Sequence, residues 1–141
     1  CLIEAQALCE LLKAYPDVYA WVSFSAKDGK HINSGESIKT CAAYLDAVPN
    51  VVAIGINCTA PQYIESLIDE IKTASSKPII VYPNGGATYN ALTKTWDGIS
   101  KSSSYGKMAQ MWYEKGAKLI GGCCQTTPMD IAQIAKWVRT F

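Results

Sequence analysis

The sequence predicts an α/β protein built on a parallel sheet. Short apolar runs rich in β-branched and aromatic residues alternate strictly with segments of helical periodicity, so right-handed crossovers are the economical topology. The runs are mostly continuous rather than alternating, as in strands that are buried on both faces. Each run also ends in a turn rich in Gly, Ser, Asn or Cys. Ligands bind at the carboxyl ends of the strands in such folds, so these turns are the first place to look for a site.

Five segments have helical periodicity. Their apolar faces are, in chain order, Ala5, Leu8, Leu12 and Tyr15; Ile38, Ala42 and Leu45; Ile64, Leu67, Ile68 and Ile71; Tyr105, Met108, Ala109 and Trp112; and Ile131, Ile134, Ala135 and Val138. Pro16 ends the first helix, the second ends before Pro49, and Gly116 closes the fourth.

Two of the helices begin with capping patterns. Thr59 with Gln62 three residues on predicts a capping box for the third helix. Thr127 followed by Pro128 predicts the N-cap and the first helical position of the fifth.

The predicted strands lie between these helices. They cover residues 19–25, 51–57, 78–84 and 118–123. The long loop 85–102, rich in Gly, Thr, Ser and Lys, is predicted to be a mobile segment over a site. With 141 residues and 49% hydrophobic content, the chain is one domain or a piece of one, with a sizeable core.

The charge pattern argues against several kinds of partner. Thirteen basic residues stand against twelve acidic ones without a cluster of Lys or Arg, so we expect neither nucleic-acid nor membrane binding. No apolar run approaches the roughly 20 residues of a membrane span, and no signal peptide is visible. We therefore expect a cytoplasmic protein, in a sequence that starts at Cys1 as a cut chain would.

Six cysteines stand at positions 1, 9, 41, 58, 123 and 124. A core-rich chain without secretion signals predicts reduced thiols rather than a disulfide framework. Cys9 and Cys41 lie in helical patterns beside apolar residues and are predicted to be small buried hydrophobes. Cys1 is terminal, which leaves three cysteines for a functional role.

Cys58 and the pair Cys123–Cys124 each follow a predicted strand, 65 residues apart. Because the carboxyl ends of parallel strands meet at one edge of a sheet, the fold can bring these thiols together. Three thiolates suit zinc, and three protein ligands leave the open fourth position that is typical of catalytic zinc. The alternative is a glycine turn followed by two buried thiols.

Three neighbours are candidate substrate-binding residues. Asn57 could hydrogen-bond a ligand sulfur or orient the turn. Gly121 and Gly122 would give the backbone freedom and leave room for a substrate.

Other functional side chains are weaker candidates. His31 is the only histidine, and a solvated loop residue is favoured over a ligand or base. Lys27 and Asp28 could touch a substrate, but a solvated turn pair is favoured. The tryptophans are interpreted as packing residues rather than a substrate cage; they are Trp21, Trp96, Trp112 and Trp137.

The motifs Gly55-Ile56-Asn57-Cys58 and Gly121-Gly122-Cys123-Cys124 together resemble those of the zinc-dependent homocysteine S-methyltransferase family. The segments SFSAKDG (23–29) and VYPNGG (81–86) fit as well, and the match covers essentially all 141 residues. The chain is most similar to the plant enzymes that use S-methylmethionine.

The resemblance implies the C-terminal half of a (β/α)8 TIM-type barrel, about strands five to eight with their helices. The domain expectation is a partial homocysteine-binding barrel over residues 1–141, with its N-terminal half, including an acidic homocysteine-binding residue, absent. The family often continues its YPN turn as Ser-Gly-Glu and soon has Tyr-Asp. This chain has neutral Gly85-Gly86-Ala87 and Tyr89-Asn90 there.

The implied chemistry is zinc-dependent methyl transfer from S-methylmethionine, or a similar sulfonium donor, to homocysteine, giving methionine. Cys58, Cys123 and Cys124 would hold the Zn²⁺, and the partners would be these small molecules. A relative using selenocysteine, betaine or methyl-folate is an alternative. So is a non-catalytic α/β module with a structural zinc or cysteine cluster.

Overall fold

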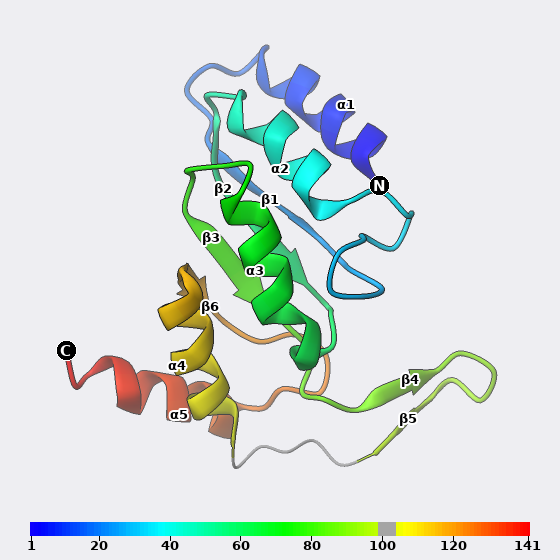
Figure 1. Ribbon diagram of the computed structural model, residues 1–141, viewed down its shortest axis with the longest axis vertical. Helices are drawn as coiled ribbons and strands as arrows, with labels where there is room; N and C mark the ends of the chain where they lie inside the picture. The colour runs from blue at the N-terminus through cyan, green and yellow to red at the C-terminus, as the bar shows by residue number, and fades with distance from the viewer. Residues whose placement is uncertain (99–103) are drawn as a thin grey trace.

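The computed structural model describes residues 1–98 and 104–141. Its centre is a four-stranded parallel sheet in the order β1-β2-β3-β6 (Figure 1). The strands are β1 (Ala20–Phe24), β2 (Val51–Asn57), β3 (Ile79–Tyr82) and β6 (Ala117–Ile120). The helices are α1 (Leu2–Leu12), α2 (Ile38–Asp46), α3 (Ile64–Lys72), α4 (Tyr105–Lys115) and α5 (Pro128–Val138), with a short 3-10 helix η1 (Pro61–Tyr63) before α3. The four predicted strands, the five predicted helices and the parallel sheet are confirmed.

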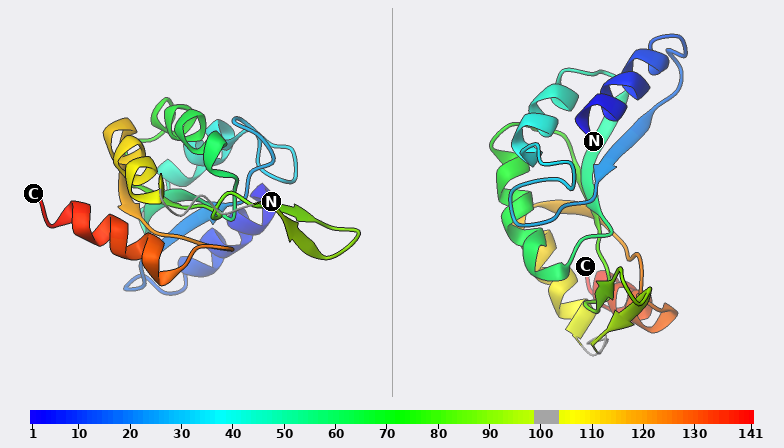
Figure 2. Two further views of the ribbon diagram at one scale, coloured as in Figure 1. Left: turned by 90° about the horizontal axis from the view of Figure 1, so that it is seen from below. Right: turned by 90° about the vertical axis from the view of Figure 1, so that its right-hand side faces the viewer.

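Helices α2, α3 and α4 cover one face of the sheet in a single layer (Figure 2). The side chains between the layers are fully buried; among them are Ile38, Leu45, Ile54, Ile56, Leu67, Ile68, Ile71 and Val81. Burying one aliphatic side chain of this size contributes roughly 1.5–3 kcal/mol. The apolar stripes of α2 and α3 are therefore what fixes the helical layer on the sheet.

The opposite face of the sheet is more open. Ser23, Gly55, Ile80 and Leu119 occupy one register row across the four strands, and Trp21 shares that face with Ser23 because side chains alternate along a strand. Trp21 is 58% exposed and Leu119 44%. The predicted burial on both faces is therefore wrong for the edge strands β1 and β6.

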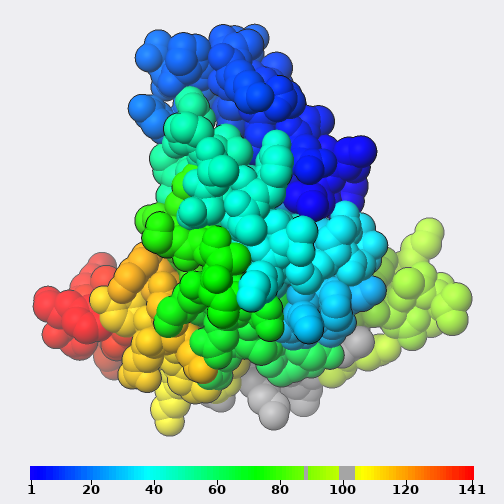
Figure 3. Space-filling view, turned by 45° about the horizontal axis from the view of Figure 1, so that its top comes forward, coloured from blue at the N-terminus to red at the C-terminus, as the bar shows by residue number. Residues whose placement is uncertain are grey.

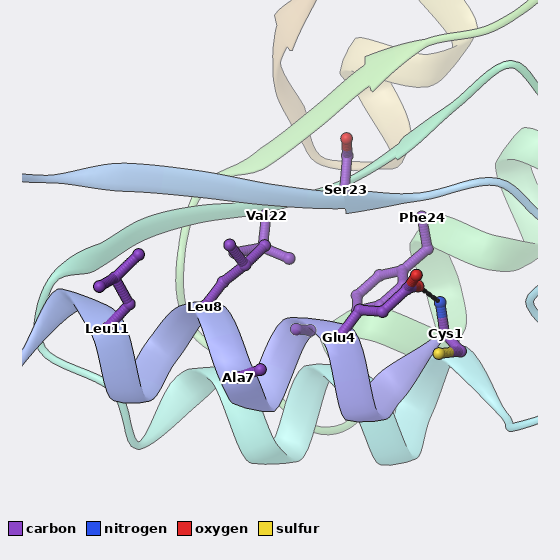
Figure 4. A pocket seen from close by; sticks show the side chains of 9 residues that line it. Cys1, Glu4, Ala7, Leu8, Leu11, Val22, Ser23 and Phe24 are labelled. Atoms are coloured by element: carbon purple, nitrogen blue, oxygen red, sulfur yellow. Dashed lines mark hydrogen bonds and ion pairs between the residues drawn. The ribbon is translucent and has the colours of Figure 1, made fainter.

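The predicted face of α1 is only partly correct. The helix ends at Leu12, and the side chains that it buries are Ala5 and Cys9. Leu8 and Tyr15 are more than half exposed. Leu8 instead points with Leu11 into an open pocket of about 630 Å³ between α1 and β1 (Figure 4).

Helix α5 differs from its prediction in the same way. Of its predicted apolar face, Ile134 is buried, whereas Ile131 and Val138 are exposed. The helix packs against α4, where the Tyr113 and Trp137 rings meet edge to face at 5.5 Å. Its start is as predicted: Thr127 is the N-cap and Pro128 the first residue.

The loop predicted over 85–102 contains regular structure. Strands β4 (Thr88–Asn90) and β5 (Thr95–Asp97) form an antiparallel hairpin, which projects from the body of the molecule (Figure 3). The Tyr89 and Trp96 rings lie 5.2 Å apart across it. Positions 99–102 of the predicted loop lie outside the described residues. Within the described ranges, every helix is too short or too polar to span a membrane.

Candidate metal centre

Three thiols meet at the carboxyl edge of the sheet. Cys58 follows β2, and Cys123 and Cys124 follow β6. The three Sγ atoms lie within 4.8 Å of one another. Among residues 1–98 and 104–141, this is the one group of three or more His, Cys, Asp or Glu side chains placed to hold a metal ion. The structure thus brings together the three cysteines that the topology predicts to meet.

The sulfurs are close enough to react with one another. Cys58 and Cys123 form a disulfide, with Cα atoms 5.6 Å apart, and the Cys124 Sγ lies 3.9 Å from that of Cys123. The sequence predicted reduced thiols throughout, so the Cys58–Cys123 disulfide differs from that prediction. Because the thiolate is the form that binds metals, metal binding requires the pair to be reduced. Cys9 and Cys41 are buried free thiols, as predicted.

The backbone after β3 holds all three cysteines. The bonds run from Cys58 N–H to Tyr82 O (3.2 Å), from Cys123 N–H to Pro83 O (2.9 Å) and from Gly85 N–H to Cys124 O (2.8 Å). Segment 82–85 therefore lies between the two cysteine-bearing turns and is bonded to each of them. This is the structural role of the YPNG motif, which the sequence did not reveal.

Cys58 itself has an unusual backbone. Its φ is +45°, in the left-handed region that non-glycine residues rarely adopt. Such a conformation costs on the order of 1–3 kcal/mol and persists where the surrounding structure enforces it. Here the hydrogen bond to Tyr82 O enforces it on one side, and the next residue, Thr59, on the other.

Thr59 is buried and ties the turns after β1 and β2 together. Its Oγ1 accepts a hydrogen bond from Ala26 N–H (2.9 Å) and donates one to Asn57 O (2.9 Å). The predicted capping box with Gln62 is therefore wrong, because the hydroxyl is already used here. Helix α3 begins after η1, without a capping side chain.

The two glycines before the cysteine pair do not have the predicted conformational role, and only Gly122 is required for steric reasons. Neither has a positive φ. A Cβ at Gly122 would lie 2.4 Å from Thr126 Oγ1, which donates to Cys123 O (2.6 Å). Only glycine leaves room for this bond. A Cβ at Gly121 would meet Tyr82 Cβ at an ordinary 3.6 Å, so the space beside it is more open.

Polar groups line a pocket of about 340 Å³ at the ends of β1 and β2. The predicted candidate Asn57 is in its wall and donates from Nδ2 to Ser25 Oγ (3.4 Å). Ser23 Oγ, also in the wall, is hydrogen-bonded to the Tyr82 hydroxyl, which reaches across β2. Asn57 directly precedes Cys58, so one residue of the pocket wall adjoins a candidate metal ligand in the chain.

The other candidates lie apart from the thiols. His31 N–H and Lys30 N–H donate to Asp28 Oδ1 (2.6 and 2.8 Å), and these bonds lower the pKa of Asp28 to about 2. The His31 ring also pairs with Asp28 Oδ2 (3.0 Å). Asp28 and His31 thus organise a turn. This agrees with the interpretation of both as turn residues rather than metal ligands or catalytic groups.

Two tryptophans have the predicted packing role. Trp112 is fully buried, and Trp137 packs against the core. Trp21 is mostly exposed, contrary to its prediction, because it faces away from the helical layer on an edge strand. Trp96 pairs with Tyr89 in the hairpin.

Comparison with known proteins gives the family. The homocysteine S-methyltransferase profile matches residues 1–138. The chain is 55% identical over 141 residues to homocysteine S-methyltransferase YbgG of Bacillus subtilis (strain 168), covering 100% of this chain and 45% of YbgG. The chain belongs to the homocysteine S-methyltransferase family.

Two further relatives in this family inform the site. Selenocysteine Se-methyltransferase of Brassica oleracea var. italica is 44% identical over 138 residues, with 95% of this chain and 40% of that protein covered. The homocysteine methyltransferase MmuM of Escherichia coli matches in its oxidized form with a TM-score of 0.81 at 34% identity, covering 96% and 42% of the two chains. Its metallated form matches with a TM-score of 0.73 at 35% identity, covering 93% and 40%.

The chain spans less than half the length of these relatives. Its four parallel strands and covering helices match the TIM-barrel fold of MmuM over that part, which confirms the predicted fold class. The three-thiol group, together with a metallated relative, indicates a site that can bind a metal ion.

Proposed function

We propose that this protein catalyses zinc-dependent methyl transfer from S-methylmethionine, or a similar sulfonium donor, to homocysteine, giving methionine. The observation that carries the proposal is the convergence of Cys58, Cys123 and Cys124 at the carboxyl edge of the sheet, in a chain of the homocysteine S-methyltransferase family. Residues 1–141 would form strands five to eight of a homocysteine-binding (β/α)8 barrel domain; the relatives are more than twice as long as this chain, which supports a partial barrel.

The donor set fits zinc. Three thiolates are soft ligands of the kind that zinc accepts in tetrahedral sites, and three protein ligands leave one position for a substrate. Bound zinc would lower the pKa of a homocysteine thiol, which is ordinarily about 8.5 for a free thiol, so that the thiolate is present at neutral pH.

The chain's own residues would position and align the reactants. The backbone of segment 82–85 keeps the three sulfurs at one point. Asn57, in the polar pocket beside Cys58, would bind the polar end of a substrate. Gly121 leaves open space next to Tyr82 for the approach of the substrate. Gly122 leaves room for the hydrogen bond from Thr126 Oγ1 to Cys123 O that closes the turn. Holding two reactants in line can lower the activation barrier of the methyl transfer by several kcal/mol.

The reaction needs little more from the protein. As the homocysteine sulfur forms its bond to the methyl carbon, the bond from that carbon to the sulfonium sulfur breaks. The thiol proton is lost to solvent, and S-methylmethionine leaves as methionine. Because a zinc-bound homocysteine would already be a thiolate, no separate general base is required, and the sulfonium is itself an activated leaving group. The pairing of His31 with Asp28, away from the thiols, agrees with this.

X-ray absorption at the zinc edge tests the proposal. In the reduced, zinc-loaded protein, sulfur coordination should rise from three to four on addition of homocysteine. Methionine should leave the spectrum unchanged, because a thioether is a much poorer zinc ligand than a thiolate. A spectrum that does not respond to homocysteine would remove zinc from the chemistry and favour a structural metal or cysteine cluster.

Selenocysteine is a second candidate acceptor. A relative 44% identical to this chain is a selenocysteine Se-methyltransferase. Both acceptors would use the same thiolates, so the metal centre cannot discriminate between them. Initial rates with homocysteine and selenocysteine at equal concentrations would decide: a higher kcat/KM for selenocysteine would reverse the assignment of the acceptor.

A further inference from the structure

The hydroxyl of Tyr105 is hydrogen-bonded to the ends of the two strands that lead to the metal centre. Tyr105 is the first residue of α4 and is 1% exposed. Its Oη lies 3.1 Å from Pro83 O and 3.0 Å from Gly121 O. Pro83 directly follows β3, and Gly121 directly follows β6. One buried side chain therefore bonds to both strand ends at the point where they enter the site.

Both carbonyl groups are linked to the cysteines through few bonds and hydrogen bonds. Pro83 O also accepts the hydrogen bond from Cys123 N–H (2.9 Å), so the same oxygen is shared by Tyr105 and a candidate metal ligand. Gly121 stands two residues before Cys123. The neighbouring atoms of segment 82–85 hold Cys58 and Cys124. A shift of Pro83 would thus be transmitted to all three sulfurs.

The phenol is well suited to this task. Burial raises the pKa of Tyr105, so the hydroxyl stays protonated and remains a donor. Its ring is fixed by an edge-to-face contact with Trp112, with centroids 5.5 Å apart. The single hydroxyl proton is shared between the two carbonyl oxygens: Pro83 O, which also accepts from the Cys123 N–H, and Gly121 O. A carbonyl left unpaired away from water is unfavourable.

We propose that Tyr105 is a positioning residue of the metal centre, whose hydroxyl sets the spacing between the cysteine turn after β6 and the segment after β3. The inference rests on the proposed function only in that the three thiols bind a metal ion. Groups that support metal ligands through hydrogen bonds typically change metal affinity by 10–100-fold when they are removed.

The test is Tyr105→Phe, which keeps the ring and removes the hydroxyl. Co²⁺ is the probe, because thiolate coordination gives it a visible spectrum that reports the geometry of the site. In the reduced full-length protein, competition with a chelator should show Co²⁺ affinity lowered 10–100-fold, and the visible bands of the residual complex should shift. Tyr113→Phe on the same helix is the matched control, since Tyr113 is at the surface. It should bind Co²⁺ as the unsubstituted protein does.

A merely structural role would give a different result. If Tyr105→Phe is less stable to urea but, while folded, binds Co²⁺ with unchanged affinity and spectrum, the positioning role is overturned. If the unsubstituted protein binds no Co²⁺, the metal centre fails, and this inference fails with it. Equal binding by both proteins overturns this inference alone.

A second substitution covers the case in which Tyr105→Phe does not fold. Replacing Tyr105 by 3-fluorotyrosine keeps the outline of the side chain and makes the hydroxyl a stronger donor. Co²⁺ affinity should then rise at least twofold. An unchanged affinity would contradict the proposal.

Discussion

At the scale of single residues, the metal centre depends on three sulfurs that come from two separate turns. Each of Cys58, Cys123 and Cys124 is within 4.8 Å of the other two, and the described residues offer no fourth His, Cys, Asp or Glu in that group. A serine hydroxyl is a far weaker zinc ligand than a thiolate. The loss of one sulfur therefore cannot be compensated by a neighbour.

Changing any one of these cysteines to serine should reduce bound zinc to below about a tenth of one ion per chain and remove methyl transfer. Metal analysis of the purified, reduced protein is the measurement. Cys9→Ala and Cys41→Ala are the controls, because both thiols are buried in the core and should leave the zinc content near normal. Full zinc retention in Cys124→Ser would contradict a three-thiolate site.

The single-residue level is also where sequence reasoning was least complete. The cysteines could be singled out because their chemistry is visible in the letters and their strand ends in the hydropathy. The left-handed φ of Cys58 could not be predicted, since cysteine has no preference for that region. Nor could the role of Tyr105, whose apolar periodicity predicts only a buried ring. Its hydrogen bonds depend on tertiary contacts between β3, β6 and α4.

At the scale of elements, the turns after the strands are fastened to one another by buried side chains. Thr59 connects the turn after β1 to the turn after β2 through Ala26 N–H and Asn57 O. Because it neighbours Cys58, it also supports the backbone of a candidate ligand.

Thr59→Val keeps the shape of this side chain and removes its hydroxyl. The Ala26 N–H would be left buried without its partner, so the free energy of unfolding should fall by about 1–3 kcal/mol. Urea denaturation measures the loss. Thr73→Val is the matched control: Thr73 is exposed at the end of α3 and bonds only to Glu70 O among the contacts described here, so about 0.5 kcal/mol or less is expected. Equal losses in the two variants would show that Thr59 is not an anchor.

The elements themselves were largely predictable. Strand and helix alternate with clear periodicities. Helices α2 and α3 bury the side chains that the pattern indicates, and α4 buries all of its predicted face except Met108, which is partly buried. The failures lie at the ends of the chain. In α1 and α5 the predicted stripe is only partly buried: Leu8, Ile131 and Val138 remain 55%, 44% and 50% exposed. The hairpin β4–β5 was missed because its strands are only three residues each.

At the scale of the whole molecule, both edges of the sheet are open. Within residues 1–98 and 104–141, strand β1 pairs only with β2, and β6 only with β3. Apolar side chains are exposed along these edges and on the helices beside them. They include Leu8, Leu11, Tyr19, Trp21, Leu119, Ile131 and Val138. The open pocket between α1 and β1 is part of this surface (Figure 4).

Open strand edges and large apolar patches favour association. Residues 1–141 expressed alone should therefore self-associate, pair with a chain that supplies further barrel strands, or remain loosely packed. Sedimentation velocity over a range of concentrations measures the association, and near-UV circular dichroism during heating measures the packing.

Replacing exposed Leu8 and Leu11 by Lys should shift the distribution toward monomer, because it charges the α1 side of the pocket. The control is the pair of substitutions Glu10→Lys and Ala14→Lys, which lie outside that pocket and should leave the distribution unchanged. A monodisperse monomer with a sharp cooperative melt would contradict the expectation, because it would show that four strands and their helices bury enough apolar surface to be stable without further partners.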